Sequence, residues 1–145
     1  MTKIETPFDE LTYKIIGLAM AVHNELGPGF PEEMYQRALC IVLSEDNIEH
    51  DREFQSDVSF RSRTLGTFRL DFVVERTIVL ELKALESLNR VHEEQVISYL
   101  AASGLNIGLL INFGSASLQH KRIFPPRAVQ NSSAFKVRRA ELQAR

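Results

Sequence analysis

The sequence predicts an α/β domain in which helices pack on a mixed β-sheet. Two amphipathic helical patterns come first, three strand-like runs follow in close succession, and a further helix leads to a run that is apolar throughout. This order, ααβββαβ, indicates an antiparallel meander followed by a helical crossover into a parallel strand. The length of 145 residues suits one domain with its own core.

Two helices begin the chain. From about Pro7 to Leu26, apolar residues recur at spacings of three and four, so they share one helical face, and the Gly-Pro-Gly sequence at 27–29 ends the pattern. The second helix is predicted to begin at Pro31, whose fixed φ suits the first helical position. Two glutamates follow in the first turn, where the helix dipole favours acids, and the polar residues 44–47 end the helix.

Three strands are predicted next. Apolar and polar residues alternate from Phe54 to Phe60, and residues 61–66 supply a polar turn. Runs rich in β-branched and aromatic residues then extend from Thr67 to Val74 and from Ile78 to Ala84. Their close spacing predicts hairpin connections between neighbours.

The remaining elements complete the sheet. A helix is predicted around Asn89 to Ser103, and the apolar run from Ile107 to Phe113 indicates an internal strand that is buried on both faces. Residues 118–124 fit an edge strand. From Pro125 onward periodicity is lost, so we expect one domain over residues 1–124 and a polar, basic, flexible tail over residues 125–145 with room for one late helical turn.

Composition restricts the class of protein. The apolar share of 44% and charged share of 25% are typical of a soluble protein, and no run approaches the ~18 apolar residues that a membrane span needs. The N-terminus has no apolar signal region, so a cytoplasmic location is expected. The only cysteine excludes an internal disulfide, and the four dispersed histidines do not have zinc-ligand spacing. A net charge of −2 gives no overall basic footprint for nucleic acid.

Three ionisable residues lie within the predicted strands. Glu81 and Lys83 are two positions apart and therefore project from the same face. If the strands pair antiparallel around a connection of residues 75–77, Asp71 lies opposite Glu81 and shares that face, whereas a slip of one residue would separate them.

Two carboxylates at close range require a proton or a cation between them. A hard divalent ion such as Mg²⁺ meets this need, because it uses one or two carboxylates and keeps several waters. Lys83 could then orient a water or stabilise charge on a phosphate. The alternative is a surface salt bridge between Lys83 and one of the acids, which contributes about 0–1 kcal/mol.

Four separated blocks of sequence resemble one known family. The first is the sequence GFPEEMY at 29–35, the second is Asp71 with the sequence ELK at 81–83, and the helix at 92–100 and the strand at 104–114 follow in order. Over roughly Phe8 to Phe124 the chain resembles the GxxExxY family of the PD-(D/E)XK nuclease-like superfamily. It departs from the superfamily pattern before Asp71, where Leu70 replaces the eponymous proline.

This resemblance implies a restriction-endonuclease-like core, αβββαβ, with a metal-dependent phosphodiesterase site. By the resemblance, Asp71 and Glu81 hold Mg²⁺, with Mn²⁺ as the alternative ion, and Lys83 acts on the attacking water. Glu32 binds the ion directly or through a water, and Gln95 orients the lysine or the water. On this interpretation Glu32, rather than Glu33, faces the sheet.

The sequence thus predicts a metal-dependent nuclease acting on nucleic acid, with DNA as the first expectation and RNA as the second. Local groups of basic residues, such as Arg61, Arg63 and Arg69, are compatible with this partner. A catalytically silent module that binds nucleic acid or protein is the main alternative, and a small-molecule phosphate hydrolase is the third. No membrane partner is expected, and a homodimer that cuts both strands is kept as an alternative to a monomer.

Overall fold

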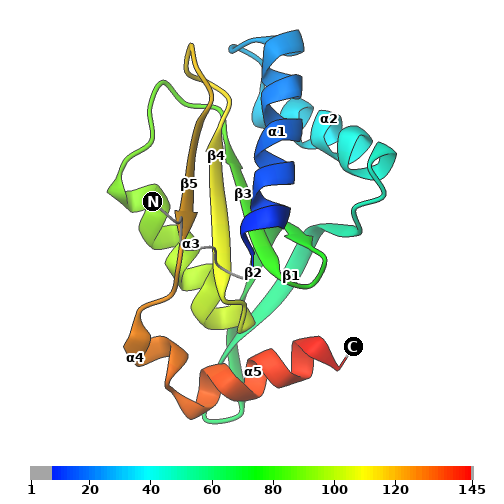
Figure 1. Cartoon of the computed structure of the whole chain (residues 1–145). Coiled ribbons are helices and arrows are strands. Elements are labelled where there is room, and N and C mark those ends of the chain that lie inside the picture. The colour runs from blue at the N-terminus through cyan, green and yellow to red at the C-terminus, as the bar shows by residue number, and fades with distance from the viewer. Residues whose placement is uncertain (1–7, 145) are drawn as a thin grey trace, which may run out of the picture.

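The computed structural model of the protein describes residues 8–144, and a five-stranded mixed sheet lies at its centre (Figure 1). The strands follow one another in the order β1-β2-β3-β4-β5. Strands β1 to β3 form the predicted antiparallel meander, β4 pairs parallel with β3, and β5 pairs antiparallel with β4. The elements are α1 (Asp9–Leu26), α2 (Glu32–Glu45), β1 (His50–Phe60), β2 (Arg63–Val74), β3 (Ile78–Lys83), α3 (Arg90–Ser103), β4 (Ile107–Asn112), β5 (Gln119–Ile123), α4 (Arg127–Gln130) and α5 (Ser133–Gln143).

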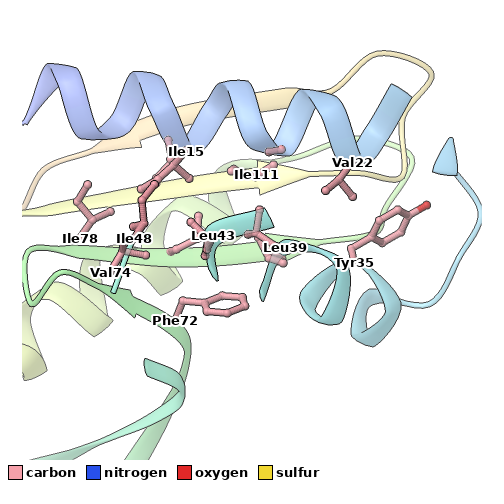
Figure 2. Packing of buried hydrophobic residues seen from close by; sticks show 14 of the residues in the cluster. Ile15, Val22, Tyr35, Leu39, Leu43, Ile48, Phe72, Val74, Ile78 and Ile111 are labelled. Carbon is pink, nitrogen blue, oxygen red and sulfur yellow. The ribbon is translucent and has the colours of Figure 1, made fainter. Parts of the chain in front are cut away.

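Helices cover both faces of the sheet, and each face has its own apolar cluster. Helices α1 and α2 pack on one face, where Ile15 and Leu39 meet Leu80 of β3. Figure 2 shows members of this cluster between the two helices and the strands. Helices α3 and α5 pack on the other face, where Leu100 and Leu142 join the cluster of Val79. Consecutive residues of β3 therefore serve opposite faces, as the strand period of two requires.

Strand β4 is buried at all six positions, which confirms the predicted internal strand. It follows α3, so the helix is the crossover that makes β3 and β4 parallel. The predicted edge strand is also present as β5. Within residues 8–144, no helix is both long enough and apolar enough to cross a bilayer.

Some element boundaries differ from the prediction. Pro31 is the N-cap residue of α2 rather than its first helical residue, because its ψ of 149° is extended. Strand β1 begins at His50, and the turn between β1 and β2 contains only Arg61 and Ser62. Both residues have positive φ, 49° and 64°, as a two-residue hairpin turn requires. The expected long polar turn was wrong because residues 63–66 form an exposed part of β2.

The segment after Pro125 forms helices α4 and α5 instead of the expected flexible tail. Phe135 and Leu142 are buried, and their spacing of two helical turns puts them on one face of α5. The Arg138 guanidinium donates a hydrogen bond of 2.7 Å to the carbonyl of Ala101 at the end of α3. The prediction missed this helix because two apolar contacts among many charges give a weak periodic signal.

We expect Phe135→Ala to destabilise the whole domain by about 3 kcal/mol, because it empties a site where the ring is only 2% exposed. Urea unfolding followed by circular dichroism measures this change. Val137→Ala is the matched control, since Val137 is 55% exposed on the same helix and its truncation should change stability by less than about 0.5 kcal/mol. A loss below about 1 kcal/mol for Phe135→Ala would show that α5 is not part of the cooperative core.

Candidate active site

The pairing of β2 with β3 places Asp71 opposite Glu81, one step beyond the last paired residues of the ladder. The connection is residues 75–77, as the sequence predicted. Beyond the ladder the two strands separate, and the Leu82 backbone N–H donates instead to Oδ2 of Asp71 at 2.8 Å. The Asp71 carboxylate thus lies in the gap between the strands. The paired residues are Phe72–Leu80, Val73–Val79 and Val74–Ile78.

The Asp71 carboxylate is held from both sides. Its Oδ1 atom accepts a hydrogen bond of 2.9 Å from the amide nitrogen of Gln36 on α2. The side-chain amide oxygen of Gln36, Oε1, accepts in turn from Nε and Nη2 of Arg52 on β1, at 3.4 and 3.2 Å. Because Gln36 is only 8% exposed, this chain of bonds fixes the orientation of the carboxylate.

Glu81 lies on the face of β3 that packs under α3, and it is only 4% exposed. Burial is the main cause that raises its pKa to about 10, and the hydrogen bond and negative charge of Asp71 add to the effect. The positive charge of Lys83 lowers this pKa but does not offset the other causes. Without a cation, Glu81 therefore carries a proton at neutral pH.

Lys83 is positioned by α3. Its Nζ atom donates to the side-chain amide oxygen of Gln95 at 2.8 Å. This hydrogen bond from β3 to α3 fixes the position of the ammonium group. Gln95, which only the family resemblance linked to Lys83, is therefore the hydrogen-bond partner of Lys83. A charge-assisted bond of this kind is shorter and stronger than a neutral one.

The segment that follows Lys83 is held by hydrogen bonds and close packing against the end of β4. The fully buried Asn112 accepts from the Leu85 backbone N–H at 2.9 Å and donates to the Leu85 carbonyl at 2.9 Å. Gly114 packs so closely that a Cβ atom there would lie 2.4 Å from the backbone nitrogen of Leu85. The Phe113 N–H also donates to the carbonyl of Lys83 at 2.8 Å. These contacts keep Lys83 in place at the open end of β3.

Helix α2 presents Glu32, and not Glu33, to the site. Glu32 is half-buried; burial is the main cause that raises its pKa, the charge of Asp71 raises it further, and Lys83 lowers it. Glu33 is exposed and forms an ion pair of 3.0 Å with Arg37. The structure therefore brings together all five residues that the sequence indicated: Glu32, Asp71, Glu81, Lys83 and Gln95.

Three residues of the site were missed by the sequence interpretation: Gln36, Arg52 and Tyr99. Burial mainly, and then the charge of Glu81, raise the pKa of Tyr99 to about 12, and a hydrogen bond to Glu81 adds to the effect. Its ring packs against Phe68, with centroids 5.1 Å apart. Gln36 and Tyr99 could have been found by spacing, because each lies one helical turn after a recognised site residue, Glu32 or Gln95.

Two other residues of the helices beside the site, Tyr35 and His92, have structural roles. Tyr35 is fully buried, stacks on Phe113 with centroids 4.6 Å apart, and donates its hydroxyl to the Gly27 carbonyl. The ring of His92 accepts a hydrogen bond from the Asn89 N–H and so caps α3. Neither residue takes part in the carboxylate cluster.

The residues present fit a hard divalent ion, although not as a cage of three acids. Among residues 8–144, no three His, Cys, Asp or Glu side chains are close enough to hold a metal by themselves. Glu32 therefore does not complete a ligand set with Asp71 and Glu81 in this structure. Two neighbouring carboxylates are nevertheless the donors that Mg²⁺ and Mn²⁺ prefer, with waters filling the remaining positions. A cation between them would replace the proton that Glu81 otherwise holds.

Comparison with known proteins agrees with this architecture. A family model described as the PD-(D/E)XK nuclease superfamily matches residues 9–123. The solved structure of a protein named SSO0001 is similar with a TM-score of 0.53 and 17% identity, and the match covers 94% of this chain and 68% of that one. An alkaline exonuclease, LHK-Exo from Laribacter hongkongensis, is similar with a TM-score of 0.50 and 12% identity, covering 99% of this chain and 83% of that one.

At these identities the two structures show the fold alone, which is the predicted restriction-endonuclease-like α/β fold. No protein with a curated description matches the sequence. The assignment therefore depends on the family model and on the geometry of the site.

Proposed function

Because this chain belongs to the PD-(D/E)XK nuclease superfamily, we propose that it is a metal-dependent nuclease that hydrolyses phosphodiester bonds in DNA. The observation that carries the proposal is the pair of the half-buried Asp71 and the buried Glu81, next to a lysine that Gln95 orients at 2.8 Å. The sequence at 29–35 has the pattern GxxExxY, and its Glu32 faces this pair. This pattern supports placing the chain in the GxxExxY family of that superfamily.

Each residue has a role that follows from its position. Asp71 and Glu81 would hold Mg²⁺ or Mn²⁺ by their carboxylate oxygens, and Glu32, whose carboxyl group senses the charges of Asp71 and Lys83, would support the same site. When bound, such an ion supplies Lewis-acid polarisation of the phosphodiester and lowers the pKa of a coordinated water. The Lys83 ammonium donates a hydrogen bond to the attacking water or to a phosphate oxygen, and Gln95 limits it to that direction.

Burial explains why these groups are arranged for chemistry rather than for stability. Ionising both carboxyl groups in this poorly solvated place would be costly, so the folded protein without metal must hold a proton on Glu81, a cost that a surface salt bridge would avoid. Gln36 and Arg52 hold the Asp71 carboxylate in one orientation beside Glu81. Strained or costly groups of this kind are characteristic of functional sites.

The experiment that tests the proposal combines metal exchange with one conservative substitution. We expect the purified protein to cleave labelled DNA with Mg²⁺ or Mn²⁺, to bind without cleaving in Ca²⁺, and to be inactive in EDTA. Asp71→Asn should reduce the cleavage rate by about 10²–10³-fold, because it removes one negative ligand while keeping its shape. Single-stranded DNA, duplex DNA and RNA are compared in the same assay.

Asp46→Asn is the matched control, because Asp46 is exposed at the opposite end of α2 from Glu32. It should leave the rate unchanged. Absence of cleavage with every ion, or equal cleavage by Asp71→Asn, would contradict the nuclease proposal. Nucleic-acid binding without turnover would then support the silent module, the alternative that the net charge of −2 leaves open.

A further inference from the structure

A chain of side-chain hydrogen bonds begins on the edge strand β1 and ends on the Asp71 carboxylate. Nη2 of Arg52 donates to Oε1 of Gln36 at 3.2 Å, and Nε2 of Gln36 donates to Oδ1 of Asp71 at 2.9 Å. An arginine can only donate and a carboxylate can only accept, so one orientation of the Gln36 amide satisfies both neighbours. The Arg52 guanidinium therefore determines which end of this amide faces Asp71.

Burial makes this orientation costly to lose. Gln36 is 8% exposed and the Arg52 side chain 29%, so water has little access to either bond. If the amide turned over, its nitrogen would face the guanidinium and its oxygen would face the carboxylate, which leaves both ends without a partner. The other oxygen of Asp71, Oδ2, accepts from the Leu82 N–H at 2.8 Å. A donor at each oxygen thus holds the carboxylate and leaves its other lone pairs for Glu81 or for a cation.

Strand β1 is distorted next to Arg52. Glu53 has a φ of 56°, a left-handed conformation that is uncommon for a residue with a Cβ atom. Arg52 pairs with Phe72, a member of the apolar cluster beneath α1 and α2 (Figure 2), whereas Phe54 packs against the cluster on the α3 face. In a regular strand, residues two apart share a face. The distortion at Glu53 therefore lets Arg52 reach α2 while Phe54 stays beneath α3.

The acids near Arg52 direct it less than Gln36 does. Oε1 of Glu33 lies 3.9 Å from Nη2 of Arg52, and Oε1 of Glu53 lies 4.0 Å from it, so both contacts are longer than hydrogen bonds. Both acids are exposed, and ion pairs of this kind contribute little. The contacts that orient the guanidinium are thus the bonds from its Nε and Nη2 atoms to Gln36.

We propose that Arg52 and Gln36 are positioning residues that set the affinity of the carboxylate site for a divalent cation. The inference rests on the proposed function, in which Asp71 is a metal ligand, and it gives the edge strand a part in that function. Arg52 acts on Asp71 through the Gln36 amide. A carboxylate that is already held in place loses less freedom when the ion binds, so the ion binds more tightly.

The proposal predicts a change of opposite sign from that of simple electrostatics. A positive charge near the site repels a divalent cation, so by Coulomb's law alone the removal of Arg52 would tighten metal binding. If Arg52 instead orients Gln36, its removal lets the amide turn and releases the carboxylate, and metal binding weakens. The direction of the change therefore distinguishes a positioning residue from a nearby charge.

Binding of Mn²⁺ to the full chain at one pH, measured by the loss of the electron paramagnetic resonance signal of free Mn²⁺, tests the proposal. We expect Gln36→Leu to weaken binding about 10–100-fold and Arg52→Met to weaken it about tenfold. Arg52→Lys keeps the charge but not the two-donor fork, so its affinity should lie between those of Arg52→Met and the wild type. In the double variant, Arg52→Met should add little to Gln36→Leu, because Arg52 acts through Gln36.

Arg37→Met is the matched control. Arg37 follows Gln36 on α2, but its side chain is 63% exposed and pairs with Glu33 at 3.0 Å. Its substitution removes the same charge and leaves the bonds to Asp71 intact, so Mn²⁺ affinity should change by less than about twofold. Thermal unfolding of each variant in EDTA separates a loss of folding from a loss of binding.

The positioning role is overturned if Arg52→Met binds Mn²⁺ as tightly as the wild type or more tightly, or if its effect and that of Gln36→Leu are additive. Cleavage of DNA in Mn²⁺, measured in parallel, separates this inference from the nuclease proposal. Weaker binding by both variants without cleavage by the wild type would uphold the positioning role and contradict the nuclease. Cleavage by the wild type with unchanged Mn²⁺ affinity in the variants would contradict the positioning role alone. A wild type that binds no Mn²⁺ would contradict both.

Discussion

Glu81→Gln is expected to stabilise the metal-free protein while it abolishes cleavage. Burial and the neighbouring Asp71 raise the pKa of Glu81 from 4.5 to about 10. The folded state therefore binds a proton that the unfolded state releases above pH 4.5, and this contribution to stability is lost as the pH rises towards 10. Glutamine keeps the shape of the protonated acid and has no charge, so the variant should not lose stability in this range.

The measurement is thermal unfolding in EDTA at pH 5 and pH 9. We expect the difference in Tm between Glu81→Gln and the wild type to be small at pH 5 and at least about 5 °C at pH 9 in favour of the variant. Glu45→Gln, at the exposed end of α2, is the control and should show no such growing difference. A Tm for Glu81→Gln that equals or falls below the wild-type value at pH 9 would show that Glu81 is ionised without strain.

Metal should reverse this order of stability. A divalent ion bound to Asp71 and Glu81 takes the place of the proton, so it stabilises the wild type by mass action, and its affinity rises with pH. Glu81→Gln lacks one of the two charges and should gain little from Mg²⁺. Its cleavage rate should fall by at least about 10³-fold, because the ligand and the charge that supports metal chemistry are lost together.

The opposition of Asp71 and Glu81 could be predicted because it depends only on local rules. A three-residue connection fixes the register of two neighbouring strands, and the period of two then fixes which side chains face each other. The structure has this register. The sequence could not show that the strands separate at Asp71 and that its carboxylate accepts the Leu82 N–H, because a side chain that replaces a ladder bond leaves no periodic signal.

The supporting residues depend on how helices cross the sheet, which no local pattern specifies. Gln36 was not identified because its role requires α2 to lie over the gap between β2 and β3. Tyr99 was missed for the same reason on α3, where an aromatic residue at helical spacing usually belongs to the core. The sequence could identify Gln36 and Tyr99 only by their positions, one helical turn after Glu32 and Gln95, which the family resemblance had already indicated as site residues.

The fold shows the same division between local and tertiary information. The elements with strong periodicity, such as α1 and β4, are where the sequence placed them. Helix α5 is not, because only Phe135 and Leu142 anchor it and the rest of its surface is polar. The contact between α5 and the end of α3, where Arg138 donates to the Ala101 carbonyl, was therefore outside the reach of the sequence.

Lys83→Met should reduce the cleavage rate by about 10²–10⁴-fold without unfolding the protein. Methionine keeps the length of the apolar stem but cannot donate to a water or to a phosphate. The ammonium group of Lys83 also lowers the pKa of Glu81, so its removal should strengthen proton binding by the carboxylate pair. Metal binding should consequently require a higher pH, and any residual activity should move in the same direction.

Gln95 acts through Lys83, so a substitution of Gln95 is a second test of the role of the lysine. Gln95→Leu removes the 2.8 Å bond that directs the ammonium group but leaves its charge, so its loss of rate should be smaller than that of Lys83→Met. In the double variant, Gln95→Leu should add little to Lys83→Met, because two groups that act as a unit are not additive. Values of kcat and KM for the four proteins measure this coupling. Wild-type kcat in Lys83→Met, or full additivity in the double variant, would remove Lys83 from the chemistry and leave it as a structural partner of α3.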